Sequence, residues 1–184
     1  MALPLRRGRA AVALSAIVLF AAPLALTACG AASADSIADT IKQNYNANSP
    51  ATMDSITCAK DLEATVGAST TCDATVTLNG GTSKQKVLVT AKNVSDGQIE
   101  PTIKTVAIDA DATFVSGMLE TGLTGGGATV KEVTCADGVS IAEGGDSQDV
   151  DCQVVGTDAQ GADLAANYTA TVNAEAQIEA QPAS

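Results

Sequence analysis

Two pairs of cysteines at matching positions place the strongest constraint on how this chain folds. The stretch "MDSITCAKD" around Cys58 resembles "VKEVTCADG" around Cys135. A further cysteine follows each one, at Cys72 and at Cys152. A second pair of similar stretches, "GQIEPTI" and "AQIEAQP", comes later in the chain. Its two members are separated by nearly the same number of residues as the stretches around Cys58 and Cys135. A near-constant offset over several elements indicates a duplicated unit of about seventy-five residues.

Both copies predict the same order of elements. A short amphipathic helix opens each unit, indicated by Ile37, Ile41 and Tyr45 in the first copy. In the second copy Asp111 is the expected helix cap and Phe114 begins the apolar stripe. A short strand then ends at the first cysteine, and a longer, alternating strand of a hairpin begins at the second. The expected fold class is therefore α+β, with two tandem small units, each one helix packed on a short antiparallel sheet with one internal disulfide.

Four cysteines allow three disulfide pairings. The repeat favours Cys58 with Cys72 and Cys135 with Cys152, because each unit then carries its own bond. In the chain-entropy model loops of this length contribute roughly 3 kcal/mol of stability each. A redox pair or a zinc site is disfavoured, since neither pair is C-x-x-C and the chain has no histidine.

The first residues have the pattern of an export signal. Arg6, Arg7 and Arg9 precede an uncharged stretch, residues 10–26, which small residues and Cys29 follow. The uncharged stretch is at the short end of the range for a membrane-spanning helix, about 17–25 residues, and Pro23 interrupts it. An uncleaved signal anchor is therefore the less favoured alternative.

The sequence "Leu26-Thr27-Ala28-Cys29" resembles the lipobox of bacterial lipoprotein signals. In that family the cysteine receives a diacylglyceryl group and the signal is cut just before it. The resemblance implies lipidation at Cys29 and anchoring of the chain to the extracytoplasmic face of the cell membrane. The expected organisation is a lipoprotein signal peptide at 1–28, a tether at 29–35, a first repeat at 36–104 and a second, acidic repeat at 105–184.

The charge is strongly acidic and unevenly distributed. Without residues 1–28 the chain holds seven lysines, no arginine and twenty-one acids, a formal charge of −14. Residues 30–104 carry eight acids and six lysines, whereas residues 105–184 carry thirteen acids and one lysine. Such a surface repels nucleic acid and favours cations. The expected partner is a basic protein or a cationic envelope component, and nucleic acid is excluded.

The first copy also resembles a known family. Its motif is Ile56-Thr57-Cys58, then Asp61-Leu62, Val66-Gly67 and Cys72. With a helix before and a hairpin after, this pattern is similar to domain-of-unknown-function family 4333, found in actinobacterial lipoproteins, over residues 36–104. The second copy keeps both cysteines but lacks Asp-Leu and Val-Gly between them. The resemblance implies an envelope location and a small α+β fold, and it carries no established reaction.

Candidates for chemistry are few. Ser83 and Lys86 fit the S-x-x-K pattern of serine acyl enzymes, but they lie beside the predicted hairpin turn instead of on a helix. Carboxylate pairs could serve a glycosidase, although aromatic residues for sugar stacking are scarce. The acids near Cys152 could hold calcium, but their spacing does not fit an EF-hand; they are Glu143, Asp146, Asp149 and Asp151.

The sequence thus predicts a non-catalytic, lipid-anchored envelope protein that acts through binding. No catalytic residue, metal ligand or cofactor is expected. Two alternatives stay open at this point. The chain could carry an apolar ligand between helix and sheet, or it could be an envelope hydrolase.

Overall fold

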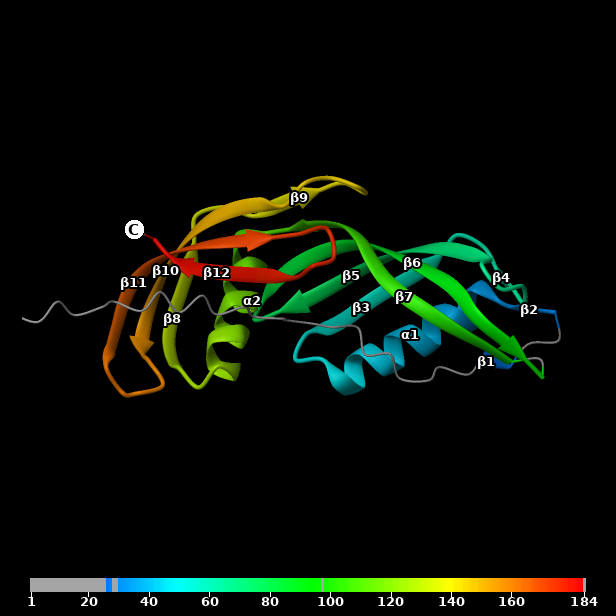
Figure 1. Cartoon of the computed structure of the whole chain (residues 1–184), viewed down its shortest axis with the longest axis horizontal. Coiled ribbons are helices and arrows are strands. Elements are labelled where there is room, and N and C mark those ends of the chain that lie inside the picture. The colour runs from blue at the N-terminus through cyan, green and yellow to red at the C-terminus, as the bar shows by residue number, and fades with distance from the viewer. Residues whose placement is uncertain (1–25, 28–29, 97, 184) are drawn as a thin grey trace, which may run out of the picture.

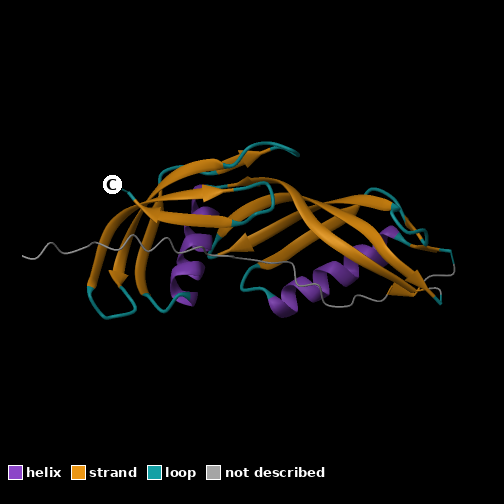
Figure 2. Ribbon diagram, in the orientation of Figure 1, coloured by secondary structure: helices purple, strands orange, loops and turns teal. Residues whose placement is uncertain are grey.

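Strands dominate the computed structural model, which describes residues 26–27, 30–96 and 98–183. Of these residues, 55% lie in strands and 19% in helices. The strands of the described part form three antiparallel sheets, and two helices accompany them (Figures 1 and 2). The expected α+β fold of two tandem helix-on-sheet units is therefore wrong.

The largest sheet has six strands. Their order is β1 (Leu26–Thr27), β7 (Gln98–Ala110), β6 (Gly81–Ser95), β5 (Ser69–Leu78) and β3 (Thr52–Cys58), and β9 (Val139–Ile141) also pairs with β7. A second sheet has the order β12 (Ile178–Pro182), β11 (Asp163–Val172), β10 (Gln148–Thr157) and β8 (Thr129–Cys135). The third is the short pair of β2 (Ala31–Ala32) and β4 (Leu62–Glu63).

Helix α1 (Ala34–Asn48) packs mainly on β3. Its apolar stripe is the predicted one, since Ile37, Ile41 and Tyr45 are all buried. Helix α2 (Ala112–Gly125) begins at the predicted cap Asp111, whose Oδ1 accepts a hydrogen bond from the backbone N–H of Phe114 at 2.8 Å. This helix contacts β5 and β6 of the six-stranded sheet and also β8 and β12 of the four-stranded sheet.

The two halves are not independent units because the six-stranded sheet extends across their expected boundary. That boundary, between residues 104 and 105, lies inside β7. Residues from β9, in the second half, complete the same sheet. The buried apolar residues of both halves form one continuous core. A helix that contacts both sheets and a shared core explain why the prediction of two separate helix-on-sheet units fails.

A β-bulge explains why the sequence pattern did not indicate the full length of β7. The register of β7 against β6 shifts between Thr105 and Ala107, where β7 carries one extra residue, Val106. Before the bulge Ile99 and Thr105 are buried, and after it Ile108 and Ala110 are buried. A bulge changes which alternate residues face the core. The burial of odd-numbered residues, seen at Ile99 and Thr105, therefore stops at the bulge, although the strand continues.

Both predicted disulfides are present. Cys58 is bonded to Cys72, and Cys135 is bonded to Cys152. Each bond joins directly opposed residues of neighbouring antiparallel strands, β3 with β5 and β8 with β10. All four cysteines are buried. Each bond therefore connects an edge strand of its sheet to the strand beside it.

Candidate functional site

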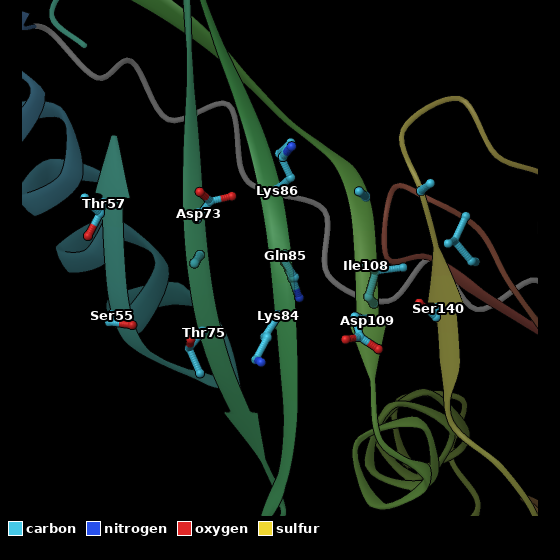
Figure 3. A pocket seen from close by; sticks show the side chains of 14 residues that line it. Ser55, Thr57, Asp73, Thr75, Lys84, Gln85, Lys86, Ile108, Asp109 and Ser140 are labelled. Atoms are coloured by element: carbon cyan, nitrogen blue, oxygen red, sulfur yellow. The ribbon is translucent and has the colours of Figure 1, made fainter. Parts of the chain in front are cut away.

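The outer face of the six-stranded sheet carries a groove of about 550 Å³ (Figure 3). The groove runs across the strands between two rows of side chains. The first row crosses five strands in register and consists of Ser55, Thr75, Lys84, Asp109 and Ser140. The second row consists of Thr57, Asp73, Lys86 and Ala107. Hydroxyl and charged groups therefore line both sides.

The floor of the groove is formed by backbone. Between the two rows lie Ala74, Gln85, Ile108 and Ile141, whose side chains are buried. Successive side chains of a strand point to opposite faces. The buried row therefore faces the core, and only its main chain lies between the two exposed rows.

Among the described residues, the charged groups of the groove form no ion pair. Lys84 is opposite Asp109 in the β6–β7 register, and Lys86 is opposite Asp73 in the β5–β6 register. Within the described ranges, however, the ion pair that forms is Lys104 with Glu175, away from the groove. Two ammonium groups and two carboxylates are thus exposed on the same face, where a ligand can reach them.

The S-x-x-K pair does not assemble a catalytic site. Ser83 is fully buried on the core face of β6, where its Oγ accepts a hydrogen bond from Gln85 Nε2 at 3.5 Å. Lys86 lies on the opposite, exposed face of the same strand. Residues three apart in a strand point in opposite directions. The lysine therefore cannot take a proton from this serine.

The acidic residues near Cys152 do not converge either. Glu143, Asp146, Asp149 and Asp151 are all exposed. Asp149 accepts a hydrogen bond from the hydroxyl of Thr171 at 2.6 Å. Across the residues that the structure describes, no three acidic, cysteine or histidine side chains are grouped to hold a metal ion.

The lipidation site predicted at Cys29 lies outside the described residues. Of the predicted signal peptide, residues 1–25 and residue 28 also lie outside them. The neighbour of Cys29, Gly30, is described, and the Gly30 carbonyl accepts a hydrogen bond from the Ala64 N–H at 3.0 Å. Leu26 and Thr27, at the end of the predicted signal, pair with Ile99 and Gln98 of β7. Neither helix in the described ranges is long and apolar enough to cross a membrane.

Comparison with known families identifies the first part of the chain. Residues 15–96 match the model of the family described as Domain of unknown function (DUF4333). Over these residues, slightly less than half of the chain, the protein is similar to the DUF4333 family. No curated protein and no solved structure matches the chain. The DUF4333 match does not reach residues 105–184, so the duplication stays a prediction from the sequence.

The groove extends beyond the DUF4333 segment. Strands β3, β5 and β6 of that segment contribute both lysines and Asp73, whereas Asp109 and Ser140 come from β7 and β9. The alternation of β5 puts Asp73 and Thr75 on the face opposite its buried residues, and this alternation is visible in the sequence. The pairing of β9 with β7 had no sequence signal, because β9 has only three residues. Sequence reasoning therefore missed the groove.

Proposed function

We propose that this protein is a non-catalytic, lipid-anchored envelope protein that binds a polar ligand in the groove of its six-stranded sheet. The observation that carries the proposal is a set of exposed charges of both signs around one floor, which form no ion pair with any described residue: Lys84 and Lys86 with Asp73 and Asp109. Charges of both signs that find no partner within a protein are available to a ligand.

The chemistry of the lining defines the class of ligand. Hydroxyls from Ser55, Thr57, Thr75 and Ser140 flank the charges, and no aromatic side chain is among the described residues of the lining. A ligand held there is recognised by hydrogen bonds and charge, not by ring stacking. Fragments of the bacterial cell wall that combine a sugar with a short peptide carry hydroxyl, carboxylate and amino groups. The groove volume is within the range of small-molecule sites, about 300–1,000 Å³.

The proposed location follows from the N-terminal sequence. The lipobox-like residues before Cys29 support a cleaved signal and a diacylglyceryl group on that cysteine, which together hold the protein on the extracytoplasmic face of the membrane. Two acyl chains give stable anchoring, whereas one chain gives marginal anchoring. A wall-derived ligand is available in that compartment.

The charge of the second half favours a second candidate partner. Residues 105–184 carry thirteen acids and one lysine, which attract a basic protein or another cationic envelope component. This partner would bind separately from the groove, since Asp109 is the single one of that half's thirteen acids among the described lining residues.

The packing of α2 does not support the alternative that the protein carries an apolar ligand between helix and sheet. Gly81 lies so close to the helix that an added Cβ would be 2.0 Å from the backbone nitrogen of Phe114. A Cβ added at Gly117 of the helix would lie 3.0 Å from Cγ of Leu78 on the sheet. Direct contact between helix and sheet leaves no space for a ligand at that position.

The binding proposal is tested by titrating soluble wall fragments against the protein and following backbone amide signals by NMR. We expect shifts along β5, β6 and β7, and weaker binding in the double variant Lys84→Gln, Lys86→Gln. The matched control is Lys92→Gln, Lys131→Gln, which removes two exposed lysines outside the groove lining. Equal affinity of both double variants would exclude the groove as the binding site.

The anchor is tested separately by the intact mass of the protein extracted from membranes. We expect loss of residues 1–28, added acyl mass on the peptide that begins at Cys29, and two disulfides. A mass without acyl groups would contradict the proposed location.

A further inference from the structure

In the part of the chain that follows the predicted cleavage, the folded body begins directly after the anchor cysteine. Gly30 is hydrogen-bonded to Ala64, and the next residues form β2, which pairs with β4. The N–H of Ala34, the first residue of α1, donates to Oδ1 of Asp61 at 2.8 Å. The tether expected at 29–35 is therefore bound to the body from Gly30 onward. A lipid on the preceding residue would hold this end of the protein at the membrane surface, because neighbouring Cα atoms are only about 3.8 Å apart.

The same end presents an exposed apolar side chain. Val66, in the turn between β4 and β5, is 65% exposed, against 37% for the other large apolar side chain exposed in the described ranges, Val155. Val66 is two residues beyond Ala64, the partner of Gly30, so it lies at most about 7 Å further along the chain.

The turn that carries Val66 is held in place by its backbone. The N–H of Thr65 donates to the Glu63 carbonyl at 2.8 Å, and the N–H of Ala68 donates to the Thr65 carbonyl at 2.9 Å. The N–H of Gly67 donates to the Ala91 carbonyl of β6 at 2.8 Å. Gly67 has a φ of 87°, a left-handed conformation that glycine adopts without strain. The valine is thus presented on an ordered turn.

The acidic half lies at the opposite end of the molecule. In Figure 1, β2 and β4 are at one end of the long axis, and β8, β10 and β11 are at the other. Residues 30–104 carry a formal charge of −2, from eight acids and six lysines, whereas residues 105–184 carry −12, from thirteen acids and one lysine. Membrane surfaces with anionic lipids repel negative charge over about a Debye length. Electrostatics therefore favours the DUF4333 end toward the membrane.

We propose that the turn around Val66 is a second membrane contact, which inserts its apolar side chain into the bilayer interface beside the lipid anchor and holds the protein end-on. This inference rests on the proposed lipid on Cys29. One valine is too small to recruit a protein to a membrane, but an attached anchor makes the second contact intramolecular, with a high effective concentration. The end-on orientation leaves the acidic half pointing away from the lipid surface.

The test uses the absence of tryptophan from the chain. The full-length variants Val66→Trp and Val155→Trp are each expressed in a host that acylates lipoproteins, checked by intact mass, and reconstituted into phosphatidylcholine vesicles with brominated lipids. We expect the emission of Val66→Trp to shift to shorter wavelength and to be quenched by bromine. The emission of Val155→Trp, in β10 at the far end, should be the same in vesicles and in detergent.

The outcomes separate the two proposals. Acylated protein whose Val66→Trp emission is not quenched, or is quenched no more than that of Val155→Trp, overturns the membrane contact and leaves the anchor standing. A mass without acyl groups overturns both. Should Val66→Trp fail to fold by circular dichroism, Thr65→Trp in the same turn is the replacement, and the same quenching is expected.

Discussion

Asp111 and Thr82 are joined by two hydrogen bonds that connect the start of α2 to the start of β6. The N–H of Thr82 donates to Asp111 Oδ2 at 2.8 Å, and the N–H of Asp111 donates to the Thr82 carbonyl at 3.1 Å. The other carboxylate oxygen of Asp111 caps the helix through Phe114. One side chain therefore both begins the helix and positions it on the sheet that carries the groove.

Replacing this carboxylate should destabilise the fold, by an amount that depends on how many of its hydrogen bonds are lost. We expect Asp111→Ala to lower the free energy of unfolding by roughly 2 kcal/mol, because both the cap and the bond from Thr82 are lost. Asp111→Asn keeps an oxygen for the cap but places an amide N–H toward Thr82, so its loss should be about half as large. Urea unfolding measures both. If Asp111→Asn is as stable as the parent, the bond from Thr82 contributes nothing.

The contact between Gly81 and α2 predicts a position-specific glycine effect. Gly81→Ala places a Cβ 2.0 Å from the Phe114 nitrogen, which the helix must move to accommodate. We expect a loss of roughly 1–3 kcal/mol, the usual range for overpacking. Gly125→Ala is the matched control, since an added Cβ there meets nothing within 4 Å. The control should be neutral or more stable by about 0.4–1 kcal/mol. Equal thermal midpoints for both variants would contradict the close packing.

Each disulfide should contribute to stability separately. In the chain-entropy model, the double variant Cys58→Ala, Cys72→Ala should lose about 3 kcal/mol, and Cys135→Ala, Cys152→Ala about the same. Because both halves share one core, we expect a single unfolding transition in calorimetry, and we expect the loss of either disulfide to lower its midpoint temperature. Two separate transitions would show instead that the halves unfold independently.

The buried phenol of Tyr45 predicts an alkaline stability effect. Among the described residues, one buried side-chain polar atom has no hydrogen-bond partner, and it is the Tyr45 hydroxyl. Burial raises the pKa of Tyr45 above its ordinary value of 10.0. The unfolded chain therefore loses this proton first, so the stability of the parent falls as the pH rises above the unfolded pKa of about 10.

Tyr45→Phe should remove that part of the pH dependence. At neutral pH we expect the variant to be as stable as the parent or slightly more stable, because no hydrogen bond is lost and the buried hydroxyl is removed. The difference in urea midpoint between variant and parent should grow with pH above 10. A variant clearly less stable than the parent at pH 7 would show that the hydroxyl has a partner.

Local sequence determined the elements that depend on neighbouring residues. The apolar positions of α1, the Asp111 cap, the alternation of β5 and the hairpin at Asn79 all follow from spacing and turn chemistry over a few residues. The two disulfides also followed, because the repeated cysteine pattern selected one of three pairings. The DUF4333 match confirmed the motif around Cys58 and Cys72.

Only the tertiary structure decided how these elements combine. The bulge at Val106 and the pairing of β9 with β7 join the two halves into one sheet. Neither has a periodic signal, since a bulge breaks the alternation and a three-residue strand is too short to show one. The groove follows from the same pairings. Residues as distant in the sequence as Ser55 and Ser140 lie in one row of side chains only because five strands are aligned in register. Short-range chemistry sets each strand, and long-range register sets the surface that they share.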